Sequence, residues 1–143
     1  MKLQRAMKVL IVSMLLVVTM ISVASLVSGA GYLEVVLPGG LPAGNAIAAF
    51  GLVSPAAVAV LLSTPGSALR AAALGTFCAA VAWLPVSIAL AGNMDLNFTG
   101  WRGSVWLGSS LVIHLAVLGT LAWSLVARAL AMGKRSSANG SSY

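Results

Sequence analysis

The chain has little charge of either sign and almost no acidic charge. Of its 143 residues, 7% are charged, and only two are Asp or Glu against eight Lys or Arg. About a quarter of the residues of a soluble domain are charged, so this composition excludes an ordinary soluble domain. The chain is instead 60% hydrophobic with a mean hydropathy of +1.05, which is typical of an integral membrane protein.

Metal ligands and the common nucleotide-binding motifs are also scarce. The chain has one cysteine, Cys78, and one histidine, His114, whereas a structural zinc site takes four Cys or His ligands. It contains neither a Walker loop nor a dinucleotide-binding fingerprint. The sequence therefore predicts no intrachain disulfide, no metal centre and no nucleotide-binding site.

Four apolar runs are long enough to cross a bilayer. They span residues 9–28, 45–63, 71–90 and 104–127, and none contains Asp, Glu, Lys or Arg. About 20 residues at 1.5 Å rise cover the roughly 30 Å hydrocarbon core. We therefore expect an all-α integral membrane protein with four transmembrane helices in a compact antiparallel bundle, forming one domain over 1–135. Residues 136–143 are expected to be a disordered tail, and residues 32–37 are a β-prone segment in a short outer loop.

The basic residues are distributed unevenly around these runs. Only Arg102 lies in an outer connection, and the other seven flank the runs on the opposite side: Lys2, Arg5, Lys8, Arg70, Arg128, Lys134 and Arg135. The positive-inside rule then places both termini and the tail in the cytoplasm. The net charge of +6 thus reflects topology rather than nucleic-acid binding. We expect the plasma or inner membrane in a bacterium, or an endomembrane in a eukaryote.

Small residues and prolines suggest how the helices pack. Lipid supplies no hydrophobic drive for helix association, so close packing depends on small residues that let backbones approach. The second run has such a face around Gly51 and Pro55, and the third has one around Gly75 and Ala79. Pro85 in the third run is, like Pro55, expected to kink its helix. We predict these five residues as helix-packing positions.

His114 lies near the middle of the fourth run, where a polar side chain is costly unless it has a hydrogen-bond partner. Ser110, four residues earlier, lies on the same helical face and can hydrogen-bond to the ring. The favoured interpretation is a neutral histidine bonded inside the bundle. The alternatives are a proton relay or substrate contact, and axial ligation of haem or chlorophyll.

The remaining polar residues gather near the outer ends of the helices. Glu34, Asn93 and Asp95 are candidates, with His114, for catalysis, because two carboxylates can divide acid and base roles in a pocket that raises one pKa. The favoured alternative is a solvated rim in which an Asp95–Arg102 pair contributes little. Asn97-Phe-Thr99 also matches the N-glycosylation sequon.

Two parts of the sequence resemble known families. The stretch from Ser110 to Trp123 resembles the pigment-binding helix of bacterial light-harvesting polypeptides, which would imply a pigment on His114. Elements across about two thirds of the chain resemble the anthrone oxygenase-like family of small four-helix membrane proteins: Gly29, Gly31, Pro38, Gly51-Leu-Val-Ser-Pro55, Pro85-Val-Ser and Asn93-Met-Asp-Leu96. That resemblance implies cofactor-free oxidation of an aromatic polyketide.

The abundance of small-residue faces and the scarcity of catalytic motifs favour one function over its alternatives. We expect an accessory or scaffold subunit that packs in the bilayer against other membrane subunits or against itself. The first alternative is a small intramembrane enzyme acting on a hydrophobic substrate. The second is a homo-oligomeric transporter or channel.

Overall fold

The computed structural model describes residues 2–38, 40, 42–91 and 100–140, and they form an all-α fold. The elements are α1 (Lys2–Ser28), the 3-10 helix η1 (Gly31–Glu34), α2 (Ala43–Leu62), α3 (Ala68–Ala91) and α4 (Gly100–Gly140). Four stretches within the α-helices are long and apolar enough to cross a membrane: Leu3–Ser28, Ala43–Leu62, Ala68–Ile88 and Gly100–Gly133. The predicted all-α fold with four membrane-spanning lengths is confirmed.

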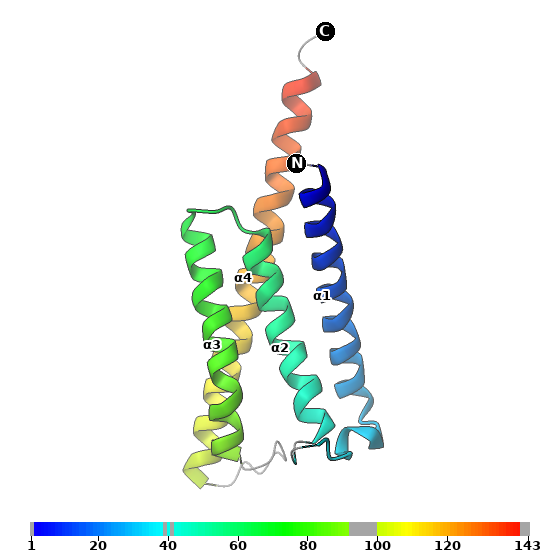
Figure 1. The fold of residues 1–143 in the computed structure, drawn as a ribbon. Helices are drawn as coiled ribbons and strands as arrows, with labels where there is room; N and C mark the ends of the chain where they lie inside the picture. The colour runs from blue at the N-terminus through cyan, green and yellow to red at the C-terminus, as the bar shows by residue number, and fades with distance from the viewer. Residues whose placement is uncertain (1, 39, 41, 92–99, 141–143) are drawn as a thin grey trace.

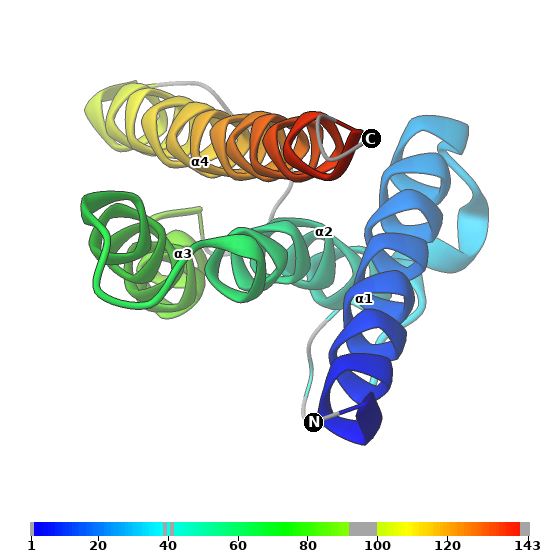
Figure 2. The ribbon, with the colours of Figure 1, turned by 90° about the horizontal axis from the view of Figure 1, so that it is seen from above.

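Consecutive helices run antiparallel, and α2 lies at the centre of the arrangement. Figure 1 shows the start of α1 and the end of α4 at one end of the molecule, which we call the terminal end; η1, the end of α3 and the start of α4 lie at the opposite end. Seen from above, α1 and α3 lie on either side of α2, and α4 runs along α2 and α3 (Figure 2). Because α2 packs extensively against each of the other helices, whereas α1 packs extensively only against α2, the bundle is more open than the compact one expected.

The contact between α1 and α2 is made by small and hydroxyl-bearing residues. A Cβ atom on Gly51 would lie only 3.3 Å from the Cβ atom of Ser22, which is the only buried residue among the described side chains of α1. One helical turn away, the hydroxyl oxygens of Thr19 and Ser54 lie 2.8 Å apart. Since neither helix presents a bulky side chain here, the two backbones approach closely.

Helices α2, α3 and α4 share the apolar core of the protein. Its buried members are Leu52, Ala56, Ala80, Trp83 and Val117. Hydrogen bonds also join these helices. The indole N–H of Trp106 donates to Ser87 Oγ at 2.7 Å, Ser124 Oγ donates to the Ala59 carbonyl at 3.3 Å, and the Arg70 guanidinium donates to the Val60 carbonyl. Where lipid is as apolar as the helices themselves, van der Waals contacts and such bonds hold the helices together.

The β-prone segment at 32–37 does not form a strand. Its first residues belong to η1, and the backbone then makes a single β-bridge between Val36 and Pro42. Pro38 follows the bridge directly, and no further strand is available among the described residues. An isolated pair of such short segments has too little cross-strand contact to become a sheet.

Helix α4 is longer than its apolar run. It has 41 residues, which corresponds to about 60 Å at 1.5 Å per residue, or about twice the hydrocarbon thickness. It therefore projects beyond the other helices at the terminal end (Figure 1). The described part of the tail expected to be disordered, residues 136–140, continues this helix, because an existing helix gains one hydrogen bond for each residue that it adds.

Candidate functional site: the pocket beside His114

An apolar pocket of about 240 Å³ lies among α2, α3 and α4. Trp83, Leu84 and Leu52 supply much of its apolar wall. Four of its lining residues carry polar groups: Asn45 from α2, Ser87 from α3, and Ser110 and His114 from α4. A mostly apolar cavity with a few convergent polar groups is the usual form of a small-molecule site, although this one is slightly below the roughly 300 Å³ at which such sites begin.

Residue spacing explains why these side chains meet. Trp106, Ser110 and His114 recur every four residues on α4, and therefore lie on one face of that helix. Trp83 and Ser87 have the same spacing on α3. The hydrogen bond from Trp106 to Ser87 joins the two faces at the edge of the pocket, so that α3 and α4 are held in register there.

The hydrogen bonds of His114 determine which ring nitrogen carries the proton. Its Nδ1 lies 2.7 Å from the backbone carbonyl oxygen of Ser110 and 3.4 Å from Ser110 Oγ. A carbonyl oxygen only accepts, so we assign the hydrogen to Nδ1, and Nε2 of the neutral ring is then an acceptor. Among the described residues Nε2 has no hydrogen-bond partner.

His114 lies in the middle of the membrane-spanning part of α4, where an unpaired Nε2 acceptor is costly. His114 lies 12 residues after Arg102 and 14 before Arg128, and thus about 18 Å and 21 Å along the helix from charges at either end. Its side chain is exposed in the single chain. An acceptor left unpaired away from water costs about 1–3 kcal/mol, so a donor from a ligand or a partner would stabilise this arrangement.

Two of the four catalytic candidates lie among the described residues, and the structure brings one of them to the pocket. His114 lines it, whereas Glu34 is exposed at the end of η1. Asn93 and Asp95 lie outside the described residues, as does the sequon at Asn97. None of the described residues that line the pocket is a carboxylate, so the described geometry offers a hydrogen-bonding site rather than an acid–base pair.

Cofactor and metal candidates can be tested against the same geometry. Nε2 of His114, free as an acceptor, fits a single axial ligand of a tetrapyrrole. The chain has no second histidine to supply another. Among the described residues, no three His, Cys, Asp or Glu side chains gather as metal ligands would.

The five predicted packing residues fall into two groups. Gly51 and Pro55 lie on the packed side of α2, and Pro55 is buried. Gly75, Ala79 and Pro85 are exposed on α3, and a Cβ on Gly75 would meet no atom within 4 Å. The face that α3 uses for packing is instead the one with its buried residues: Ala73, Ala80, Trp83 and Ser87.

Sequence reasoning missed Asn45, Trp83 and Ser87 as lining residues. A signal for two of them was present, since Trp83 and Ser87 repeat the four-residue spacing of Trp106 and Ser110. Their chemistry is that of a site that binds an apolar molecule and offers hydrogen bonds at one side.

No family model matches the chain, and neither the curated proteins nor the solved structures contain a match to it.

Proposed function

We propose that this protein is an accessory subunit of a membrane complex, with both termini in the cytoplasm, and that α3 is the helix that docks on a partner. The observation that carries the proposal is the small-residue face of α3, which consists of Ala71, Gly75, Ala79 and Ala82. All four side chains are exposed. Small residues at this spacing allow a second transmembrane helix to approach closely.

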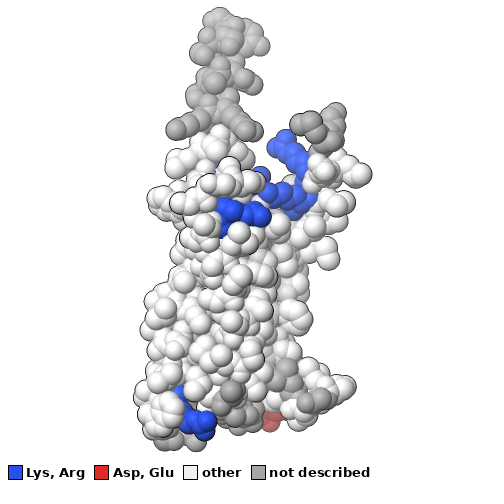
Figure 3. All heavy atoms as spheres, turned by 60° about the vertical axis from the view of Figure 1, so that its left-hand side comes forward, with Lys and Arg blue, Asp and Glu red and all other residues white. Residues whose placement is uncertain are grey.

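This face is separate from the face that holds the protein together. Ala73 and Ala80 point into the bundle, whereas the open space around Gly75 lies on another side of the same helix. A partner helix can therefore dock without displacing α2 or α4. The cytoplasmic placement of both termini is supported by the basic side chains that gather at the terminal end (Figure 3).

Substitution of Gly75 by Leu tests the proposal. A Cβ atom at position 75 would have no described atom within 4 Å, so we expect the protein to fold and insert as before but to lose most of its partner. Gly119→Leu is the matched control, because Gly119 is also exposed within a transmembrane helix and also has open space around it. Each tagged variant is purified in a mild detergent from its native membrane and analysed by native electrophoresis.

Loss of the large complex in Gly75→Leu but not in Gly119→Leu supports docking through α3. Equal recovery of the complex in both variants refutes it. A wild-type protein that migrates alone, without larger subunits or further copies, also contradicts the accessory role.

The pocket favours a second candidate function, an enzyme acting on a hydrophobic substrate. In that case His114 Nε2 accepts a hydrogen bond from a hydroxyl of the substrate, while Trp83 and Leu52 contact its apolar part. Titration with 1-naphthol, followed by tryptophan fluorescence, tests for such binding. We expect saturable quenching whose affinity falls about tenfold in His114→Leu, since one hydrogen bond is worth about 1 kcal/mol. Quenching that does not saturate, or that is unchanged in His114→Leu, argues against this function.

A further inference from the structure

A second cavity, of about 290 Å³, lies at the terminal end of the bundle. We call it the terminal cavity. Three basic side chains line it: Arg5 and Lys8 from α1, and Arg128 from α4. Ser63 and Thr64, at the end of α2, and Ser124 of α4 add hydroxyl groups. The cavity is thus formed by helices that come from both ends of the sequence.

Among the described residues, no carboxylate balances the positive charges at this cavity. None of the described residues that line it is acidic, and the chain has only two acidic side chains, those of Glu34 and Asp95. The acidic side chain in view in Figure 3 lies at the end of the molecule opposite the main basic group. The charges of Arg128 and Arg70 also act on Lys8 with the same sign. Like charges repel one another, and an anion bound between them would relieve that repulsion.

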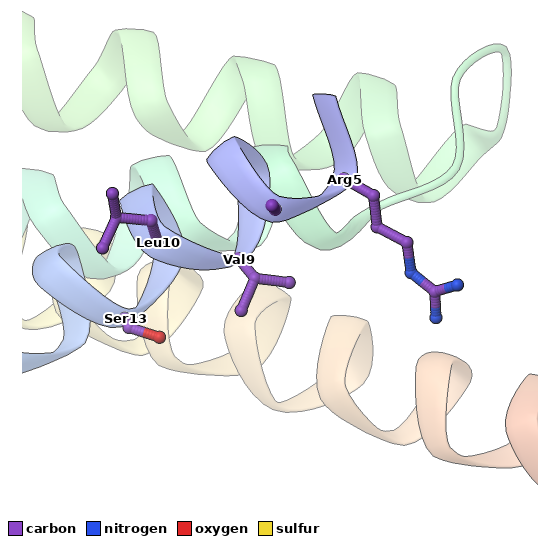
Figure 4. A pocket seen from close by; sticks show the side chains of 5 residues that line it. Arg5, Val9, Leu10 and Ser13 are labelled. Carbon is purple, nitrogen blue, oxygen red and sulfur yellow. The ribbon is translucent and has the colours of Figure 1, made fainter. Parts of the chain in front are cut away.

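An apolar hollow adjoins the terminal cavity. It has a volume of about 510 Å³ and is lined along α1 by Ala6, Val9, Leu10 and Ser13, with Arg5 at its edge. Figure 4 shows the guanidinium group of Arg5 extending away from Val9, Leu10 and Ser13, toward the terminal end. Arg5 therefore lines both spaces, one cationic and one apolar.

The arrangement of the helices explains why this space exists. Because α1 packs extensively only against α2, part of its surface is left open, and the described lining of the hollow comes from α1 alone. Lys8 directly precedes the first apolar run, and Arg128 directly follows the fourth. The cationic groups therefore lie at the depth of the lipid headgroups, and the hollow extends from that depth along Val9 and Leu10 to Ser13, toward the acyl chains.

We propose that the terminal cavity binds the phosphate of an anionic phospholipid, with one acyl chain of that lipid in the hollow along α1. Arg5, Lys8 and Arg128 hold the phosphate, because guanidinium and ammonium groups form charge-assisted hydrogen bonds with its oxygens. A free phosphate ion has the same headgroup chemistry, but it leaves the hollow empty. The lipid bridges α1 and α4, and basic pockets between membrane helices are a recurring form of site for anionic headgroups.

The test uses the full chain, purified in dodecyl maltoside and freed of lipid. Phosphatidylglycerol, phosphatidylcholine and inorganic phosphate are added separately. Binding is followed by native mass spectrometry, and thermal unfolding is followed by circular dichroism. We expect one phosphatidylglycerol to bind saturably and to raise Tm, because a ligand of the native state stabilises it. Phosphatidylcholine and inorganic phosphate are each expected to bind at least tenfold more weakly.

Variants locate the site. We expect Arg128→Gln to lower the affinity for phosphatidylglycerol about tenfold, and Arg102→Gln, which removes a charge at the opposite end, to leave it unchanged. Val9→Trp fills the hollow and is expected to weaken lipid binding while every cation is retained. Lys8→Gln provides a second headgroup variant should Arg128→Gln fail to fold.

Three results would overturn the proposal. Equal affinity for phosphatidylglycerol and phosphatidylcholine would show that the charge is not recognised. Equal loss in Arg102→Gln and Arg128→Gln would place binding elsewhere. An inorganic phosphate effect as large as that of phosphatidylglycerol, unchanged in Val9→Trp, would show that the site takes a free anion and not a lipid.

Discussion

Gly51 should be the most size-sensitive position in the contact between α1 and α2. A Cβ there lies 3.3 Å from the Cβ of Ser22, which leaves no space for the further carbons of a Leu side chain. Overpacking of this kind costs about 1–3 kcal/mol. Leu also has a higher helix propensity than Gly by about 0.8 kcal/mol, which opposes the loss. We therefore expect Gly51→Leu to destabilise the protein by a net of about 0–2 kcal/mol.

Gly75→Leu separates the two contributions. It makes the same change of helix propensity on an exposed face, where no atom lies within 4 Å of a new Cβ. The difference in stability between the two Leu variants should thus equal the packing cost alone, about 1–3 kcal/mol. Gly51→Ala needs a shift of only a few tenths of an ångström, and its gain in helix propensity of about 1 kcal/mol should leave it close to the wild type.

The assay is unfolding by sodium dodecyl sulfate in mixed micelles, followed by tryptophan fluorescence and circular dichroism. Ser22→Gly in the Gly51→Leu background should recover part of the lost stability, because it removes the side chain that the new Leu meets. The two substitutions should be non-additive, as expected for residues in contact. Equal stabilities of Gly51→Leu and Gly75→Leu, or strictly additive effects of Ser22→Gly, would refute the argument that this contact attaches α1 to the bundle.

Three further substitutions test the polar contacts within the bundle. Thr19→Val removes the hydrogen bond to Ser54 and should lower stability by about 0.6 kcal/mol, the average for such bonds between membrane helices; the same unfolding assay would contradict this with a loss above 2 kcal/mol. Trp106→Phe removes the donor to Ser87 and should cost about 0.5–1.5 kcal/mol, with unchanged stability as the contrary result. His114→Leu removes an exposed polar ring from the middle of the membrane-spanning helix. The isolated variant should be at least as stable as the wild type. A lower unfolding midpoint would show that the hydrogen bond to Ser110 stabilises the protein by more than the desolvation of the ring costs.

Much of the architecture was predictable because the bilayer constrains length and charge so strongly. The four runs free of Asp, Glu, Lys and Arg coincide with the four helices that are long and apolar enough to span a membrane. The short connection at Pro65-Gly66 accounts for the antiparallel pairing of α2 and α3, since it allows no other arrangement. The β-prone segment at 32–37 did not become a strand, because no neighbouring strand was available with which it could pair.

The pocket was only partly predictable. His114 was singled out because an imidazole in an apolar run is costly wherever it points, and Ser110 followed from its four-residue spacing. Asn45, Trp83 and Ser87 come from two other helices. Their approach to His114 depends on the rotation of each helix about its axis, which no spacing within one helix determines.

Helix α3 shows most clearly which feature of the packing cannot be predicted from the sequence. It carries small residues on two faces, one with Ala73 and Ala80, the other with Gly75 and Ala79, and in the single chain it buries the first. In a soluble protein the polar face would identify the outside, but in a bilayer both faces contact apolar surroundings and hydrophobicity does not distinguish them. The sequence alone thus determined the number of helices and the length of their apolar parts, because hydrocarbon thickness and the cost of charge act on each run separately. Only the tertiary structure decided which faces meet, because that choice depends on shape complementarity between helices far apart in the chain.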